Sequence, residues 1–429
     1  MKYTAIPVLA LVSLALLIAG CTGPEHPGPP AGQDTPVPPV ATTPSPVSGS
    51  GESVVAANNR FALDLYARLA DEEDGNIFFS PFSISSALAI TWEGARGNTA
   101  DEIRAVFHFP DDPAVMREEF AATMAGINSG SSAYTLRTAN ALWAEQTYPF
   151  LPEYISTAGR YYSADTTNLD FITKPEESRV TINTWVEEQT GEKIKDILPE
   201  GSIDPLTRLV ITNAIYFKGT WVKQFDEEKT TEETFRTGTG TIIRVPMMQR
   251  TDKDAVYGYA ETDVLQVLSM PYESDSGKEL SMLVLLPKGD DLTAVGLDAE
   301  SLSDLQQNLT SRRVMVYFPK FTLETKYSLP PTLSVMGMPT AFTGAADFSG
   351  MDGTRNLFID DVIHQAFVEV NEEGTEAAAA TAGIIKLSSM PVEEPVPVFR
   401  ADHPFIFLIQ DDETGNILFM GRVTNPVGS

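Results

Sequence analysis

Residues 369–383 read EVNEEGTEAAAATAG, and this stretch decides how the rest of the chain is interpreted. Taken alone, Glu372–Ala382 predicts a helix, because four consecutive alanines are the best helix formers and Thr375 is a suitable N-cap. Which structure the stretch adopts depends on the fold that surrounds it.

The N-terminal third of the folded part predicts helices. Apolar residues recur at helical spacing over residues 52–70. After a short apolar strand, Ile77–Phe79, a serine and a proline predict the start of a second helix, with Ser80 as N-cap. Thr99 and Glu102 predict a capping box at the start of a third helix.

Beyond residue 205 the sequence becomes rich in branched and aromatic residues, which predicts strands. The last two strands are separated by DDETGN, a plausible hairpin loop. Helices first and strands later predict an α+β fold with an antiparallel or mixed sheet. The expected strands are 209–217, 280–286, 313–318, 357–370, 405–410 and 417–423.

The first 52 residues are interpreted as segments outside the folded domain. Residues 1–21 predict a signal peptide whose end resembles the lipobox of lipoproteins, with Cys21 as the lipidated residue; an ordinary signal peptide with an incidental cysteine is the alternative. Residues 22–52 are dominated by Pro, Gly, Ser and Thr, which predicts a disordered stalk. Residues 53–429 are left as the folded domain.

The composition excludes several classes of function. The 59 acidic and 30 basic residues give a formal charge of −29, which would repel a phosphate backbone, so no nucleic acid partner is expected. Cys21 is the only cysteine, so neither an internal disulfide nor a multi-cysteine metal site is available. We expect no metal and no cofactor.

The familiar sequence signatures of hydrolases, zinc enzymes and nucleotide-binding proteins are missing. One enzyme hypothesis is a hydrolase with Ser80 or Ser83 as nucleophile and His364 as base. Ser80 is already explained as a helix cap, and His364 lies within an apolar strand where a buried, hydrogen-bonded ring is the simpler interpretation. We therefore expect a protein that is not an enzyme.

Eight segments in a fixed order resemble the serpin family and together cover residues 53–427. The resemblance implies about nine helices around three β-sheets, with a large central sheet and an exposed reactive-centre loop at about 372–391. It suggests a prokaryotic member that is secreted or anchored as a lipoprotein. The segments are NIFFSPFSISSALAI, GARGNTADEI, INTWVEEQTGEKIKDIL, TNAIYFKGTW, VMVYFPKFTLETKYSL, AFTGAADFSGM, EVNEEGTEAAAATAG and HPFIFLIQDDETGNILFMGRVTNP.

The resemblance also implies roles for single residues in and above the central sheet. Ser80, Ser83, Asn213 and His364 match the family's shutter, a polar cluster that lets two central strands part. Trp221 matches the tryptophan of the breach, where the loop first enters the sheet. The same residues also suit a structural interpretation as a capped helix, a satisfied buried histidine and a core tryptophan.

For the opening stretch the resemblance implies, in place of the helix, an exposed loop that becomes a strand once it is cut. In inhibitory serpins the cut loop inserts into the central sheet, a known example of strand addition. Thr375, Ala377, Ala379 and Thr381 would form one alternating face and Glu376, Ala378 and Ala380 the other. Small side chains on the inward face permit entry. The hinge residues are Glu372, Gly374, Thr375, Ala377, Ala378, Ala379 and Ala380.

The spacing usual in the family, counted from Glu372, places the bond that a protease attacks at Ser388–Ser389. Leu387 and Lys386 are alternative residues for the position before the bond. Ser388 would suit an elastase-like enzyme and Leu387 a chymotrypsin- or subtilisin-like one. Lys386 would suit a trypsin-like enzyme but lies early in the loop, so we favour a subtilisin-, chymotrypsin- or elastase-like target.

The resemblance implies an irreversible suicide-substrate inhibitor of serine endopeptidases that acts by cleavage of the loop, trapping of the acyl-enzyme and loop insertion. A non-inhibitory serpin that acts as a surface binding module is the alternative. We expect a monomer outside the cell, secreted or tethered to the outer face of the membrane through Cys21.

Overall fold

The computed structural model describes residues 53–128, 134–275, 278–289, 292–375 and 395–428. None of the helices in these ranges combines the length and the apolar character needed to cross a bilayer. The described residues form nine α-helices: α1 (Val54–Glu72), α2 (Pro81–Gly94), α3 (Gly97–Val106), α4 (Pro113–Asn128), α5 (Pro152–Tyr162), α6 (Pro175–Gln189), α7 (Ala299–Gln307), α8 (Pro330–Met336) and α9 (Ser349–Asp352).

The strands of the described ranges form three sheets. The central sheet has the order β12 (Phe321–Ser328), β13 (Ile363–Val370), β14 (Gly374–Thr375), β4 (Leu209–Thr220), β2 (Tyr134–Glu145) and β3 (Ala164–Leu169). A seven-stranded antiparallel sheet has the order β1 (Ile77–Phe79), β17 (Ile417–Val423), β16 (Phe405–Asp411), β9 (Leu280–Pro287), β8 (Leu265–Pro271), β7 (Val256–Glu261) and β10 (Thr310–Arg313). The third contains β15 (Val398–Arg400), β11 (Met315–Pro319), β6 (Ile242–Arg250) and β5 (Thr231–Arg236).

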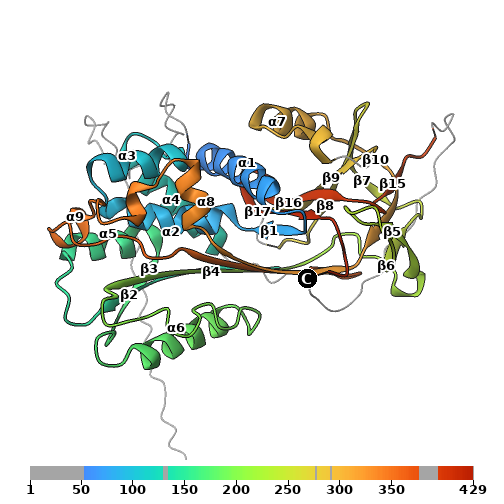
Figure 1. Ribbon diagram of the computed structural model, residues 1–429. Helices are drawn as coiled ribbons and strands as arrows, with labels where there is room; N and C mark the ends of the chain where they lie inside the picture. Colours follow the sequence, from blue (N-terminus) through green and yellow to red (C-terminus); the bar gives the residue numbers. More distant parts are fainter. Residues whose placement is uncertain (1–52, 129–133, 276–277, 290–291, 376–394, 429) are drawn as a thin grey trace, which may run out of the picture. The chain divides into compact units, whose positions relative to one another are not determined.

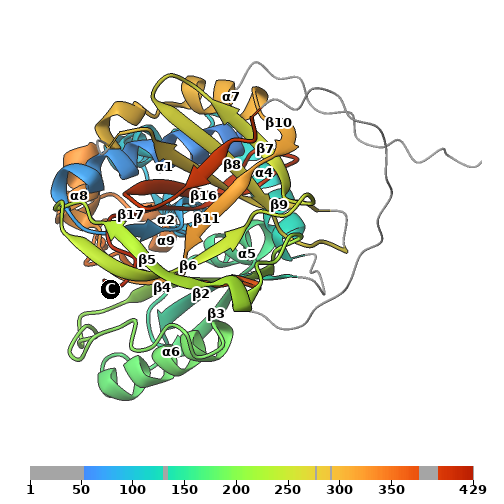
Figure 2. The same ribbon diagram turned by 90° about the vertical axis from the view of Figure 1, so that its right-hand side faces the viewer.

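The central sheet separates two apolar cores. Among the helices of the described ranges, α6 is the one that covers one of its faces, while α1, α2, α4 and α5 lie on the other side (Figure 1). The smaller core, under α6, includes Trp143, Phe171 and Val186. The larger core lies on the opposite face and includes Ile215 and Phe217 of β4. The four-stranded sheet lies at one end of the folded unit and faces the viewer in Figure 2.

Several elements expected from the sequence are confirmed. Strand β1 has the predicted bounds, and α2 begins at Pro81 with Ser80 as its N-cap, whose Oγ accepts a hydrogen bond from Ser83 N at 3.2 Å. Strands β16 and β17 form the expected hairpin. The sheets are antiparallel or mixed, as an α+β chain of this pattern predicts.

The capping box predicted at the third helix is wrong. Helix α3 begins at Gly97, and its N-cap Arg96 makes no side-chain capping bond. Thr99 Oγ1 instead accepts a hydrogen bond from the backbone N–H of Asp347 at 3.0 Å, and Glu102 accepts one from Thr340 N at 2.9 Å. The side chains of Thr99 and Glu102, which were expected to cap the helix, instead form hydrogen bonds with a distant segment of the chain.

The division into helices first and strands later is also incomplete. Strands β2 and β3 lie between helices α4 and α6, in the half of the chain where no long strand was expected. The strand predicted over 357–370 begins only at Ile363.

Candidate functional site

Two of the predicted hinge residues already lie in the central sheet. Gly374 and Thr375 form β14, which pairs antiparallel with Thr220 and Gly219 of β4. On its other side Thr375 lies opposite Val370 of β13. The remaining hinge residues Ala377–Ala380, the attacked bond Ser388–Ser389 and its alternatives Leu387 and Lys386 lie outside the described residues.

A tight turn carries the chain from β13 into β14. The Oδ1 atom of Asn371 accepts hydrogen bonds from the backbone N–H groups of Glu373 and Gly374, at 3.1 and 3.2 Å. Trp221 fixes this turn to the end of β4, because its backbone N–H donates to Glu373 O at 2.8 Å and its indole N–H donates to Asn371 O at 3.1 Å. The indole is buried and stacks on the Tyr272 ring at 4.4 Å between centroids.

Gly374 allows β14 to approach β4 closely, and Gly219 leaves room for the ring of Tyr272 beside it. A Cβ at Gly374 would lie 2.0 Å from the carbonyl oxygen of Gly219, a contact that no rearrangement of side chains could relieve. A Cβ at Gly219 would lie 2.7 Å from Cδ1 of Tyr272. Thr375 is buried beside them and exchanges a hydrogen bond of 2.9 Å with the Tyr272 hydroxyl. Glycine at position 374 is therefore required by the fit as well as by the freedom of a hinge.

Glu372 anchors the turn to residues that adjoin the four-stranded sheet. Its carbonyl accepts a hydrogen bond from Phe225 N at 2.8 Å, and its carboxylate lies 2.7 Å from Lys320 Nζ and 2.7 Å from Thr230 Oγ1. Burial by itself raises the pKa of this carboxyl, but the Lys320 ammonium and the Thr230 hydroxyl outweigh it, and the pKa lies below its usual value. Glu372 is thus ionised and paired at neutral pH.

Three of the four predicted shutter residues meet on the α2 side of the central sheet. The backbone N–H of Ser80 donates to His364 Nε2 at 3.0 Å, and the Ser80 hydroxyl donates to Leu418 O at 2.7 Å. Ser83 is buried next to them, and its hydroxyl has no hydrogen-bond partner among the described residues. Asn213 lies in β4, and its side chain is outside the described part of the chain. Burial lowers the pKa of His364 to about 3, so the ring is neutral.

This geometry gives no support to the hydrolase hypothesis. His364 Nε2 already accepts the backbone N–H of Ser80, so it cannot take a proton from the Ser80 hydroxyl. Both residues are also buried, Ser80 at 0% and His364 at 4% exposure.

Of the residues that hold the hinge in place, the sequence singled out Trp221 but not Lys320, Thr230, Gly219 or Tyr272. Lys320 and Gly219 lie inside two of the family-like segments, which was a usable signal. Thr230 and Tyr272 have no local signal, because their importance depends on contacts with residues more than a hundred positions away.

Comparisons with known proteins agree with this architecture. The family model Serpin (serine protease inhibitor) matches residues 56–426. An uncharacterised serpin-like protein of Thermococcus kodakarensis is 42% identical over 430 residues and covers 98% of each chain. The human leukocyte elastase inhibitor is 44% identical over 386 residues, 87% of this chain and 100% of its own.

Among solved structures, an Arabidopsis serpin in its native stressed conformation matches with a TM-score of 0.77 at 30% identity, covering 88% of this chain and 100% of its own. The fold that the resemblance implied, nine helices and three sheets in the described residues, is confirmed. The chain belongs to the serpin family of serine protease inhibitors.

Proposed function

We propose that this serpin is an irreversible suicide-substrate inhibitor of serine endopeptidases. The observation that carries the proposal is the position of β14, hydrogen-bonded between β13 and β4 at the entrance of the central sheet. A protease that cuts the loop separates the part that follows β14 from the chain that continues toward the C-terminus. The cut loop then extends β14 as a full strand and carries the acyl-enzyme to the far end of the sheet.

The register of β14 supports this course. Continued without a bulge, it places Ile385 opposite Leu209, the first residue of β4. The bond Ser388–Ser389 then lies just beyond the end of the strand. The same registers bring Thr381 opposite both Asn213 of β4 and His364 of β13, at the level of the shutter.

The register also assigns the two faces of the inserted strand. Directly opposite residues on neighbouring strands share a face. Ala377 and Ala379 would lie opposite Phe217 and Ile215, which are buried in the larger core. Small side chains are therefore needed on the face that carries Thr375, Ala377 and Ala379, and the sequence provides them.

Incubation of the full chain with chymotrypsin, subtilisin or elastase should give a covalent complex that survives boiling in denaturant. Thr375→Arg should abolish the complex and leave a cleaved substrate, because Thr375 is buried at 1% exposure and cannot be replaced by a cation. Thr375→Ser keeps the hydroxyl and should still form the complex. Cleavage without complex by every protease would exclude inhibition and favour a non-inhibitory serpin that acts as a surface binding module.

The proposed attacked bond is Ser388–Ser389, with Leu387 and Lys386 as alternatives before the cut. The name of the human relative, leukocyte elastase inhibitor, supports an elastase-like target, and Leu387 would suit a subtilisin- or chymotrypsin-like one. N-terminal sequencing of the fragment released on cleavage identifies the bond. A cut well before Lys386 would contradict the count from Glu372.

We also propose that residues 1–21 direct export, that residues 22–52 form a stalk, and that a monomer is held at the outer face of the membrane through Cys21. Cys21→Ser should release the protein into the medium. Unchanged retention in the membrane fraction would contradict the tether and leave the inhibitor proposal untouched.

A further inference from the structure

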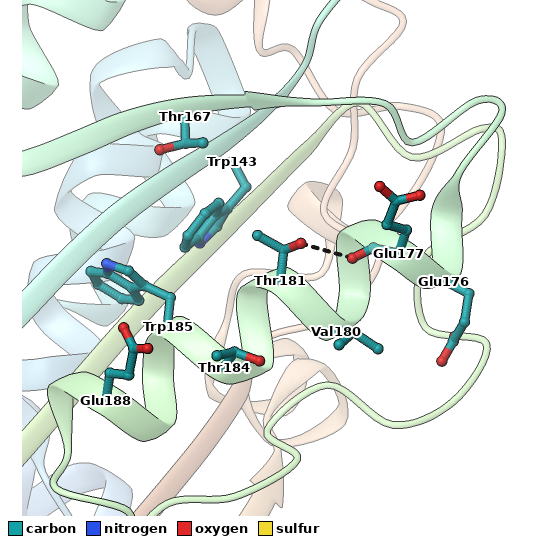
Figure 3. Close-up of a pocket in the computed structure, with 9 residues that line it drawn as sticks. All are labelled: Trp143, Thr167, Glu176, Glu177, Val180, Thr181, Thr184, Trp185 and Glu188. Carbon is teal, nitrogen blue, oxygen red and sulfur yellow. Dashed lines mark hydrogen bonds between the residues drawn. The ribbon is translucent and has the colours of Figure 1, made fainter.

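A pocket of about 650 Å³ lies between helix α6 and the β3 edge of the central sheet, away from the hinge and the shutter. Figure 3 shows Trp143 and Trp185 close together in this pocket, with Thr181 and Thr184 along the helix. Thr167 of β3 lies on the sheet side.

The two indole rings form aromatic walls. Their centroids lie 5.4 Å apart and their planes meet at 79°. The indole N–H of Trp143 donates to Thr212 Oγ1 at 2.8 Å, so its polar edge is satisfied within the sheet. The Thr181 hydroxyl is likewise engaged, because it donates to Glu177 O at 2.9 Å. Because Trp143 is only 3% exposed, the half-buried ring of Trp185 is the indole face that the pocket presents.

The charged side chains that line the pocket are all acidic: Glu176, Glu177 and Glu188. Glu176 is paired with Arg179 at 2.7 Å, and Glu177 with Lys174 at 3.0 Å. Glu188 forms no ion pair with any residue that the structure describes, and Figure 3 shows it beside Trp185. The end of the pocket that holds the indoles thus carries an uncompensated negative charge.

We propose that this pocket binds an organic ammonium cation with an apolar body. Indole faces attract such cations through their quadrupoles, and a carboxylate beside them adds direct charge attraction. The net charge of −29 raises the local concentration of cations further and disfavours anions. A methylated ammonium suits the site better than the compact, strongly hydrated ammonium of lysine, because it costs less to remove from water. The proposal does not depend on protease inhibition.

The test uses the intact full chain and a pair of probes of the same shape. Benzyltrimethylammonium carries the charge, and 2-methyl-1-phenylpropan-2-ol is its neutral counterpart. Calorimetric titration should show the cation binding more tightly, on the order of tenfold, with the difference shrinking as salt is added. The intrinsic fluorescence should change with the same midpoint, because two of the four tryptophans line the pocket.

Two variants on α6 separate this site from general charge attraction. Glu188→Gln should remove most of the advantage of the cation over the neutral probe, while Glu187→Gln, one position away and not part of the pocket, should leave it unchanged. Trp185→Leu should weaken both probes; if it does not fold, the two glutamate variants still decide. Equal affinity for the two probes, no detectable binding of the cation, or an equal effect of Glu187→Gln would each overturn the proposal.

Discussion

At the residue scale, Glu372 ties the hinge to Lys320 and Thr230. Its carboxylate is buried and joins Lys320 and Thr230, so Glu372→Gln should lower the free energy of unfolding by about 1–2 kcal/mol. Because the folded pKa is lowered, the wild-type contribution is present above the unfolded pKa and is lost as pH falls through the folded value.

Urea unfolding of the wild type and of Glu372→Gln, at pH 7 and below pH 4, measures the difference in their free energies of unfolding. Glu373→Gln is the matched control, because this neighbour contributes its backbone to the turn and its side chain forms no ion pair within the described ranges. An equal loss in both variants, or a loss that does not shrink in acid, would contradict the role of the pair.

His364 makes the shutter sensitive to acid. The folded chain holds the ring neutral down to about pH 3, whereas an unfolded histidine binds a proton near pH 6.5. The unfolded state therefore binds more protons than the folded state below about pH 6.5. As the pH is lowered, the free energy of unfolding decreases by at most about 1.4 kcal/mol per pH unit.

His364→Gln should remove this part of the slope between pH 7 and pH 5, as measured from urea midpoints. His108→Gln, a partly exposed histidine paired with Asp64, serves as the control for the loss of any histidine. A slope that is unchanged in His364→Gln would show that the acid response comes from other groups.

At the scale of elements, the decisive prediction concerns the strand that the cut loop would form. The registers bring Thr381 to the shutter level, opposite Asn213 and His364. Thr381→Glu should stop insertion there, because an unpaired carboxylate would enter a buried site. The cleaved variant should then gain much less thermal stability than the cleaved wild type, while Thr381→Ser should gain the full amount. Full stabilisation of Thr381→Glu would rule out this register.

Local patterns in the sequence identified the elements whose signals are local. The cap at Ser80, the strand Ile77–Phe79 and the hairpin between β16 and β17 depend on neighbouring residues, and all three are confirmed. The capping box predicted at Thr99 is wrong because the threonine hydroxyl accepts a hydrogen bond from the backbone N–H of Asp347, far along the chain.

The hinge shows the same division between local and distant causes. Alanine-rich sequence favours a helix, yet Gly374 and Thr375 are strand, because the edges of β4 and β13 offer backbone partners on both sides. Family resemblance implied an exposed loop that becomes a strand only after cleavage. The strand already present at Gly374–Thr375, and the contacts of Thr230 and Tyr272 that hold it, required the folded structure.

At the scale of the whole molecule, the proposed mechanism requires a resting fold that stores free energy and releases it on cleavage. A strand along the whole of β4 would add about a dozen backbone hydrogen bonds, worth on the order of 10 kcal/mol before the cost of ordering the loop. Cleavage should therefore raise the thermal unfolding temperature of the chain strongly. Scanning calorimetry before and after a single cut in the loop measures the rise, and an unchanged or lower temperature would contradict insertion.

Because β14 is already paired with β4 in the resting protein, the register of every residue that inserts after Thr375 is fixed in advance. Glu376 would come opposite Lys218, on the face toward α6. One alanine inserted between Thr375 and Glu376 would turn that glutamate toward Phe217 and the larger core, whereas two alanines would return it to the α6 face. Trapping of the protease should fail with one inserted alanine and survive in part with two. The number of loop residues after Thr375 would then set how far a captured protease is moved, and whether that number is odd or even would set which side chains face the core.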